Sequence, residues 1–451
     1  MTQTLPEGIV TRVTALVTDL VTWAQRHPGA TLAEQEALVV SLLHGFAPDL
    51  LLALLPLTVR ELRLPLAGQR QACPQCRGRC GVQEWRPRVI LTCCGEVRYE
   101  RPWYWCRGCR RVWAPADQVL EVERRQWVSA GLHGWLIALG AATDFREAAE
   151  LLAELTGLQV ASETVRQHTE RAGAALEVAQ QAACATVMTT QEAAEPVEPA
   201  PGQLVVEADG VVVRYQEDWH EVKVGLVAGH AGGKTQAPSY VAAREGPDAF
   251  GPRLLTEAAR RGALDVVGWS GPLAGKGLAQ LRPVVVIGDG AHWIWNLAAE
   301  HFAQPTEIVD FYHASQHLWE VARTVYGAGT AEAQAWAETQ RAALRGQGVA
   351  PVLAALQALP VPSPEAQALV RREQGYFQSN HARMAYPTFR AQGLPIGSGA
   401  VESSAKHVVQ LRMKRPGSRW SDRGAHGVLM VRTHRLSGRL GPTFATSRPA
   451  A

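Results

Sequence analysis

The sequence lacks a strong net charge, a visible signal-peptide pattern and an uninterrupted hydrophobic run. Lysine and arginine exceed the acidic residues by only three, so any affinity for nucleic acid must come from local patches. The N-terminus shows no basic segment followed by an apolar core and a small-residue cleavage site. The most apolar stretch, residues 36–57, contains His44, Pro48 and Asp49, and it predicts a buried helical hairpin instead of a membrane span. A cytoplasmic protein is therefore expected.

Cysteine is also scarce, with eight in 451 residues. In the reducing cytosol such cysteines suit a metal better than a disulfide. Two CxxC pairs, Cys73/Cys76 and Cys106/Cys109, flank a stretch of β-like alternation. A tetrahedral zinc site needs two thiolate pairs brought together by a hairpin, so residues 69–115 predict a zinc ribbon, with a chance pairing or a redox pair as alternatives. Three further cysteines are either spare thiols or ligands of a second site: Cys80, Cys93 and Cys94.

Positive charge is concentrated in two segments. Residues 70–112 carry ten Arg against three Glu, and residues 403–451 carry ten Lys or Arg against Asp422 alone. Such clusters are typical of proteins that bind a phosphate backbone, although a basic segment can also be only a solvated surface.

The first part of the chain is predicted to be helical except for the ribbon. Residues 1–68 have helical periodicity and predict a small domain for packing or self-association. Residues 116–185 contain two helices separated by Thr156-Gly157, which predicts a helix-turn-helix region; an ordinary helical hairpin is the alternative. Residues 186–202, with three prolines and three glutamates, predict a linker. The second helix of the pair would present four residues to a major groove: Ser162, Thr164, Arg166 and Gln167.

Two hydrophobic runs each deliver a carboxylate followed by glycine. Asp209-Gly210 lies within residues 203–215, and Asp289-Gly290 lies within residues 283–291. With the neighbouring segments these runs give the order β-β-β-α-β-α-β, which is the order of a ribonuclease-H-like sheet. In that topology the first and fourth strands are neighbours, so the two aspartates are expected side by side.

A third acid, Glu402, follows a glycine-bearing loop at the start of a predicted helix. On that helix Lys406 shares its face, and Val401, Val408 and Leu411 are available for the core. Three carboxylates suit Mg²⁺ or Mn²⁺, and two such ions about 3.5–4 Å apart can support phosphoryl transfer. The sequence thus predicts a multidomain protein with an α/β ribonuclease-H-like core and an all-α insertion, preceded by helical, zinc-ribbon and helix-turn-helix domains. The predicted core covers residues 203–315 and 392–435, the insertion covers 316–391, and a basic tail covers 436–451.

Several motifs carry a family resemblance. They are Gly288-Asp-Gly-Ala-His-Trp-Ile-Trp295, Asp310-Phe-Tyr-His313, Gly397-Ser-Gly-Ala-Val-Glu-Ser403, Arg412-Met-Lys414 and Arg419-Trp420. Over roughly residues 70–435 the chain resembles the DDE transposases of bacterial insertion sequences, most closely the Kra-type group and more distantly Mutator-like elements.

The resemblance implies that Asp209, Asp289 and Glu402 bind the catalytic metal, with Asp310 and His313 as an accompanying acid-x-x-His signature. For His313 a packed or hydrogen-bonded role is the alternative. The implied activity is metal-dependent cleavage at the terminal inverted repeats of the element, followed by strand transfer to target DNA. Such enzymes usually work as dimers or larger assemblies, here in a bacterial cytoplasm next to the nucleoid.

The basic residues after Glu402 are the candidates for DNA contact in this part of the chain. Trp420, flanked by Arg419 and Arg423, is the candidate for stacking on a base. Two other functions stay open: a non-catalytic DNA-binding repressor or host-adopted remnant, and a structure-selective nuclease. The intact set of three acids favours the transposase. The remaining candidates for DNA contact are Lys406, Arg412, Lys414 and Arg415.

Overall fold

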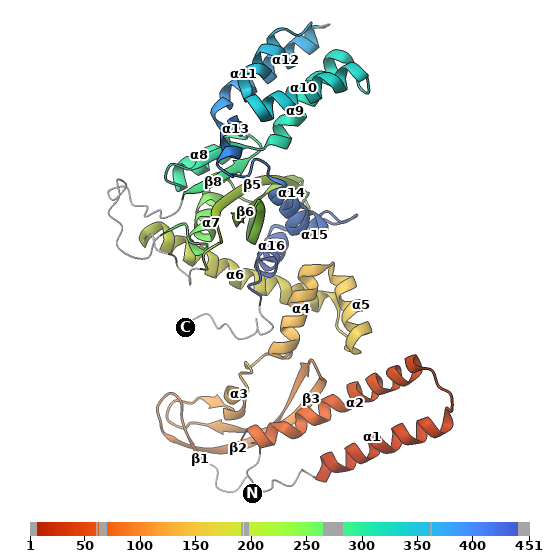
Figure 1. The fold of residues 1–451 in the computed structure, drawn as a ribbon. Coiled ribbons are helices and arrows are strands. Elements are labelled where there is room, and N and C mark those ends of the chain that lie inside the picture. The colour runs from red at the N-terminus through yellow and green to blue at the C-terminus, as the bar shows by residue number, and fades with distance from the viewer. Residues whose placement is uncertain are drawn as a thin grey trace. The chain divides into compact units, whose positions relative to one another are not determined.

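The structure, a computed structural model, describes residues 7–59, 62, 70–190, 193, 198–264, 283–360 and 363–440 (Figure 1). It is a multidomain α/β protein with two sheets. The chain separates into two compact units. The first contains the residues up to Gly140 together with Phe145–His168, and the second contains Ala141–Asp144 and Thr169–Leu440. Most of the predicted basic tail lies outside the described residues.

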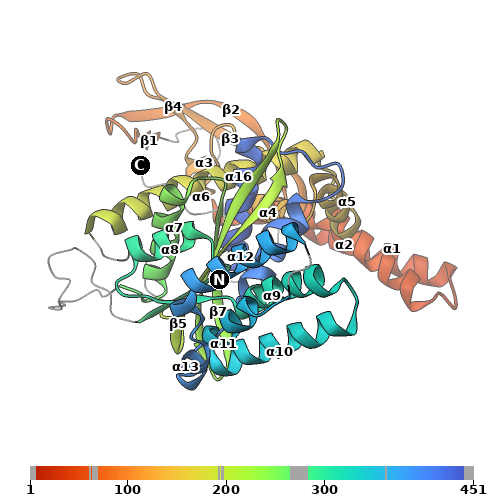
Figure 2. The ribbon, with the colours of Figure 1, turned by 90° about the horizontal axis from the view of Figure 1, so that it is seen from above.

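The first unit begins with a helical hairpin. Helices α1 (Glu7–Arg26) and α2 (Leu32–Thr58) lie side by side in both views (Figures 1 and 2). Thr31 starts α2 because its hydroxyl accepts from the Glu34 N–H while the Glu34 carboxylate accepts from the Thr31 N–H. The expectation of a buried hairpin within residues 36–57 is wrong. Helix α2 continues through Pro48, whose ring removes only one backbone hydrogen bond, and of its residues only Leu55 is buried.

Within the described residues, α2 is the one helix that is long and apolar enough to cross a membrane by length and composition. Very little of it is buried inside the protein.

A four-stranded antiparallel sheet follows the hairpin in the chain. Its strands lie in the order β1 (Arg70–Ala72), β2 (Arg79–Thr92), β3 (Gly95–Trp105) and β4 (Val112–Trp113). The alternating residues between the CxxC pairs therefore form a β hairpin, as expected. The inward-facing residues Ile90, Val97 and Tyr99 pack with Leu55 of α2.

Four helices follow this sheet: α3 (Pro115–Val119), α4 (Ala130–Ala142), α5 (Phe145–Thr156) and α6 (Ser162–Thr190). Gly157, with φ 73°, ends α5, because this left-handed conformation suits a residue without a Cβ. Helices α4 and α5 and the start of α6 share a small core that includes Leu132, Leu152 and Val165. Helix α6 extends to Thr190, so the predicted linker begins too early; Val187 and Ala200 are both buried in the core of the second unit.

The second unit contains a mixed five-stranded sheet in the order β7-β6-β5-β8-β9. Strand β5 is central; β6 and β7 continue it as an antiparallel meander, and β8 and β9 run parallel to it. The first and fourth strands are neighbours, as expected. Its elements in chain order are β5 (Gln203–Arg214), β6 (Trp219–Ala231), β7 (Lys234–Ala243), α7 (Pro247–Arg260), β8 (Val284–Gly288), α8 (His292–His301) and β9 (Thr306–Val309).

The predicted insertion is helical, as expected, but its first helix begins earlier than residue 316. The last strand stops at Val309 because the Asp310 side chain accepts hydrogen bonds from two backbone N–H groups and caps α9. The helices are α9 (Phe311–Tyr326), α10 (Ala331–Gln347), α11 (Val349–Gln357), α12 (Pro364–Ser379), η2 (His381–Met384) and α13 (Tyr386–Ala391).

The helix that carries Glu402 is irregular. It consists of α14 (Gly399–Ser404), the π-helical turn η3 (Ala405–Gln410) and α15 (Leu411–Met413), and α16 (Asp422–Leu436) follows. Val401 and Val408 are buried, as expected, but Leu411 is 50% exposed and Arg412 is buried in its place. A π turn contains more residues than an α turn, so it shifts every later side chain around the helix axis.

Candidate metal centre and carboxylate site

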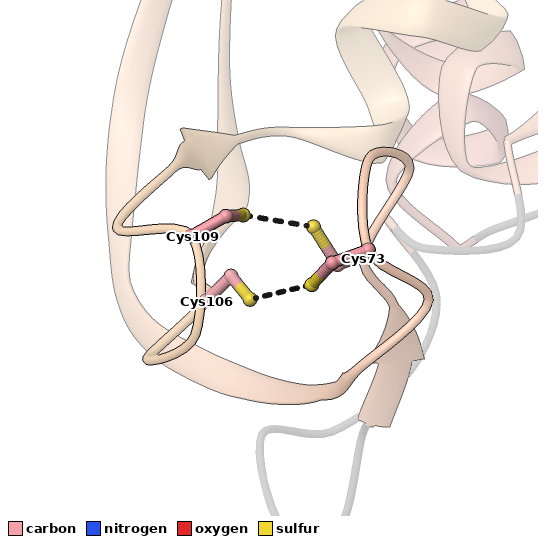
Figure 3. A group of neighbouring side chains, drawn as sticks. Cys73, Cys106 and Cys109 are labelled. Carbon is pink, nitrogen blue, oxygen red and sulfur yellow. Dashed lines mark hydrogen bonds between the residues drawn. The ribbon is translucent and has the colours of Figure 1, made fainter.

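The two CxxC pairs meet at one end of the four-stranded sheet, as Figure 3 shows. The Sγ atoms of Cys73 and Cys109 are 3.4 Å apart, as are those of Cys76 and Cys106, and all four lie within 4.8 Å of one another. Four sulfurs bound to one zinc ion at about 2.3 Å stand about 3.8 Å apart, so the group could hold a structural metal such as zinc.

The loops around these cysteines favour a thiolate at the first cysteine of each pair, whereas the pKa of the second cysteine is raised, at Cys109 by the Cys73 thiol to about 12. In each pair the backbone N–H of the second cysteine lowers the pKa of the first, and for Cys106 the pKa falls to about 6. N–H groups that point at sulfur stabilise its charged form.

The other ribbon cysteines are not part of this group. Burial raises the pKa of Cys80 to about 11, and its Sγ donates to the Gly78 carbonyl, so it stays a protonated thiol beside the four-sulfur group. Burial also raises the pKa of Cys93 to about 11. In the part of the chain that the structure describes, neither Cys93 nor Cys94 belongs to a metal-ligand group.

Asp209 and Asp289 lie at the edge of the five-stranded sheet where β8 ends beside the middle of β5. Glu207 of β5 pairs with Ile287 of β8, and this register, continued by two residues, places Asp209 opposite Asp289. Asp209 accepts a hydrogen bond of 2.7 Å from the Gly210 N–H, and Asp289 accepts one of 2.9 Å from the Ala291 N–H. Both side chains are half-buried; Asp289 directly follows β8, and Asp209 lies within β5, two residues past its last pair with β8.

Glu402 brings a third carboxylate to this edge. It lies in the first turn of α14 and is exposed. Burial raises the pKa of Asp209, and the negative charges of Asp289, Glu402 and Glu221 raise it further. Among the residues that the structure describes, no Lys or Arg forms an ion pair with Asp209, Asp289 or Glu402. The three acids therefore share an uncompensated negative charge, which suits a divalent cation with oxygen ligands.

These three acids are more widely spaced than the cysteines. Within the described ranges, their oxygens do not form a group that lies within 4.8 Å, as the four sulfurs do. A pair of ions needs ligands spread over such a wider space.

Two buried carboxyl groups hold the segment that carries Glu402. Asp310 accepts from the Ser398 N–H at 2.5 Å and from the Ser398 hydroxyl, and its other oxygen accepts from the Tyr312 and His313 N–H groups. Glu207 accepts from the Val401 N–H at 2.7 Å. Helix α14 is thus fixed to β5, and the loop before it is fixed to Asp310 at the start of α9, which determines where Glu402 stands.

Among the acids of this region, Glu207 has the pKa that is shifted most. It is 2% exposed, and burial raises its pKa to about 8, with a further rise from the charges of Asp310 and Glu402. Its position two residues before Asp209 puts both on the same face of β5. Sequence reasoning missed Glu207, although this i, i+2 spacing of two acids on a buried strand was a usable signal.

His313 lies in the first turn of α9 and faces the carboxylates. Burial lowers its pKa, while the charges of Asp289, Asp310 and Glu402 oppose that change. Its Nε2 is 3.3 Å from Nε2 of His317, whose Nδ1 is 2.6 Å from the fully buried Glu373 carboxylate. Burial opposes ionisation of Glu373, but hydrogen bonds from His317 and Arg372 lower its pKa.

This chain of groups fixes the ring of His313. Because ionised Glu373 accepts the Nδ1 proton of His317, the His317 Nε2 of a neutral ring is an acceptor for the Nε2–H of His313. Tyr376 stacks on His317 at 4.0 Å and donates to the Asp289 carbonyl at 3.2 Å. Sequence reasoning missed His317, Glu373 and Tyr376, which lie on helices without a local motif.

His317, Glu320 and Glu373 also lie close enough to ligate a metal. The guanidinium of Arg372 already binds both glutamates, at 3.0 Å and 2.6 Å. The group is therefore a satisfied ion network.

The predicted DNA contacts on the Glu402 helix divide into two sets. Lys406, Lys414 and Arg419 are exposed, as DNA contact requires. Arg412 and Trp420 are 2% and 7% exposed, so the expectation that they contact DNA is wrong. The Arg412 guanidinium lies 5.0 Å from the Trp420 ring centre, and the indole N–H donates to the Met413 carbonyl at 3.0 Å. The π turn rotates Arg412 inward, and Trp420 is held in the core by a β-bridge to Tyr215.

The remaining candidates are partly engaged within the protein. Arg415 forms an ion pair of 2.5 Å with Asp144. On α6, Arg166 and Gln167 both bind Glu163, while Ser162 is exposed and Thr164 is half-buried.

The fold and sites define a multidomain α/β protein with a Cys₄ cluster and a separate carboxylate site. Residues 72–442 match the model of an uncharacterised protein family, UPF0236, and this match covers 371 of the 451 residues. The chain therefore belongs to this family. No curated protein matches it.

Proposed function

We propose that the protein is a DDE transposase with a ribonuclease-H-like core. It would bind the terminal inverted repeats of its insertion sequence and catalyse metal-dependent DNA cleavage and strand transfer. The observation that carries the proposal is the convergence of Asp209, Asp289 and Glu402 at the edge formed by β5, β8 and α14, with no paired cation among the described residues.

The strand arrangement supports the same assignment. A central first strand, an antiparallel meander on one side and two parallel strands on the other correspond to the ribonuclease-H-like order predicted from the sequence. In this arrangement the carboxyl end of β8 and the middle of β5, where its pairing with β8 stops, present their acids together.

Each residue has a role in this proposal. Asp209, Asp289 and Glu402 would hold two Mg²⁺ or Mn²⁺ ions, which supply charge stabilisation at a phosphodiester when bound. Glu207 and Asp310 fix the position of Glu402 through the backbone of α14 and its preceding loop. His313, held by His317 and Glu373, would contact the DNA backbone or move a proton at the edge of the site.

The surface chemistry fits a nucleic-acid partner. Of the ten ribbon arginines, Arg101 binds Asp117 and Arg88 binds three backbone carbonyls. The other eight have exposed side chains, which suits contact with phosphates. They are Arg70, Arg77, Arg79, Arg86, Arg98, Arg107, Arg110 and Arg111.

The same proposal includes three further points. Helices α5 and α6 would form a helix-turn-helix, the protein would be cytoplasmic and lie next to the nucleoid, and it would act as a homodimer or a larger assembly. Paired DNA ends require at least two copies of the recognition surface.

The test is cleavage of a labelled duplex that carries the DNA flanking the gene, with Mg²⁺ or Mn²⁺ and with a chelator. We expect nicking by the wild type and none by Asp209→Ala, Asp289→Ala or Glu402→Ala. Asp248→Ala, which removes an exposed acid in the first turn of α7, is the matched control and should cut normally. End-specific binding without nicking by the wild type would reject the enzyme in favour of a DNA-binding repressor or remnant.

A further inference from the structure

The α1–α2 hairpin has an apolar face without a partner within the part of the chain that the structure describes. On α1 the side chains of this face are Val10, Val13, Val17 and Val21, and on α2 they are Leu32, Val39, Leu43, Leu50, Leu54 and Leu57. Two further apolar side chains of α2 are exposed, Val40 beside this face and Leu52 on the opposite side of the helix. Their exposed fractions run from 37% to 79%. Exposed apolar side chains in such a number on two adjacent helices indicate a surface that another molecule covers.

These side chains form one stripe on each helix. At about 100° per residue, the four valines fall within about 80° around α1 and the six α2 residues fall within about 60°. The half-buried Leu16 and Leu20 mark the side of α1 toward α2, and Leu38 and Leu42 mark the opposing side of α2. On each helix the centre of the exposed stripe is rotated about the helix axis by roughly 90–100° from the side that faces the other helix, in the same sense along the chain. Because the two helices are antiparallel, these rotations bring both stripes to the same face of the hairpin.

We infer that a second copy of this chain covers this face, so that two hairpins form a four-helix bundle. The same patch on both chains would meet across a two-fold axis. Each hairpin supplies two helices with apolar stripes along their length, as such a bundle requires.

The available area matches a stable dimer. A fully exposed Val or Leu side chain offers on the order of 100 Å² of apolar surface, so ten half-exposed side chains offer about 500 Å². Because homodimer interfaces are about 65% apolar, an apolar area of about 500 Å² corresponds to a total interface of about 770 Å² on each chain. A standard interface buries about 800 Å² on each partner.

The alternative occupant, a lipid bilayer, fits the structure less well. Leu51 and Leu55 of α2 pack against residues of the four-stranded sheet, so α2 would have to leave that sheet to be surrounded by lipid. Asp49 of α2 forms an ion pair with Arg12 of α1, and Glu34 and His44 lie on other sides of α2. A membrane span has hydrocarbon on every side, whereas one side of α2 is occupied by the sheet.

The test is the mass of the full-length protein in solution, measured by analytical ultracentrifugation at micromolar concentration. We expect twice 48.9 kDa for the wild type. Leu43→Glu should weaken the dimer by about tenfold or more, because it buries a charge in the apolar contact. Leu52→Glu is the matched control, since Leu52 is 38% exposed on the opposite side of α2, and it should remain dimeric.

Circular dichroism and bound zinc should be the same for all three proteins. A monomeric wild type would overturn the inference, and so would a dimer that Leu43→Glu leaves intact or that both variants dissociate equally. A monomer that binds phosphatidylglycerol vesicles would assign the face to lipid. The inference does not depend on the proposed chemistry, because DNA cleavage is not measured.

Discussion

Replacing Asp310 by alanine tests how the carboxylate site is held together. Asp310 is 1% exposed and accepts four hydrogen bonds, two from Ser398 and two from the first turn of α9. Ser398 is itself buried, so its N–H and hydroxyl would lose their acceptor without gaining water.

The magnitude follows from these bonds. A buried donor without an acceptor costs about 1–3 kcal/mol, and loss of a helix N-cap costs about 1 kcal/mol. Two donors of Ser398 and one cap give about 3–7 kcal/mol. The hydroxyl can rotate, and removal of a buried charge beside Glu207 offsets part of the loss. We expect the free energy of unfolding of the second unit to fall by about 3 kcal/mol.

The assay combines urea unfolding with hydrogen exchange of the segment that contains residues 396–404. Asp310→Ala should speed exchange in this segment far more than in β5 or β8. Asp248→Ala removes an exposed acid from the first turn of α7 and should change the free energy of unfolding by less than about 0.5 kcal/mol. A loss below about 1 kcal/mol for Asp310→Ala, with unchanged exchange at residues 396–404, would refute the role given to Asp310.

Three further results are expected. Cys106→Ala should abolish binding of zinc by the ribbon in metal analysis, whereas Cys80→Ala should retain it, because Cys80 lies outside the four-sulfur group. Burial lowers the pKa of His434 to about 4, so stability should fall as pH drops from 6.5 toward 4, by up to about 3 kcal/mol, and urea unfolding of His434→Gln should lack this dependence. A Cβ at Gly173 would lie 2.0 Å from a backbone oxygen of α16, so Gly173→Ala should lower stability by about 2 kcal/mol or more in the same assay, whereas Gly346→Ala, in open space on α10, should not.

The features that were predictable from the sequence have local signals. A CxxC pair fixes two thiols on one loop, and the alternating residues between the pairs specify the hairpin that joins them. Asp209 and Asp289 could be placed side by side because each comes at the end of a buried apolar run and because the order of elements limits which strands are neighbours.

The features that were not predictable depend on packing. The outward rotation of Leu411 and the burial of Arg412 follow from a π turn, which has no distinct residue pattern. Helix α6 extends past the predicted start of the linker because Val187 packs into the core of the second unit. Hydrophobic periodicity also did not reveal that α2 is exposed. The apolar stripe of α2 has the sequence pattern of a buried helix, but in the structure it lies on an exposed face.

The acids of the carboxylate site differ in role because they differ in depth, and residue type does not reveal depth. Along β5, Glu207 is buried to 2% exposure with its pKa raised to about 8, whereas Asp209, two residues nearer the strand end, is half-buried. A carboxyl group at the depth of Glu207 is held in a neutral form at pH 7 and can only orient its neighbours through hydrogen bonds. A carboxyl group at the depth of Asp209 reaches solvent and is accessible to a cation. Two acids on the same face of β5 therefore differ in role: Glu207 positions its neighbours, and Asp209 is available to bind metal. The difference depends on how far α14 covers this face, since α14 covers Glu207, which accepts the hydrogen bond from the Val401 N–H.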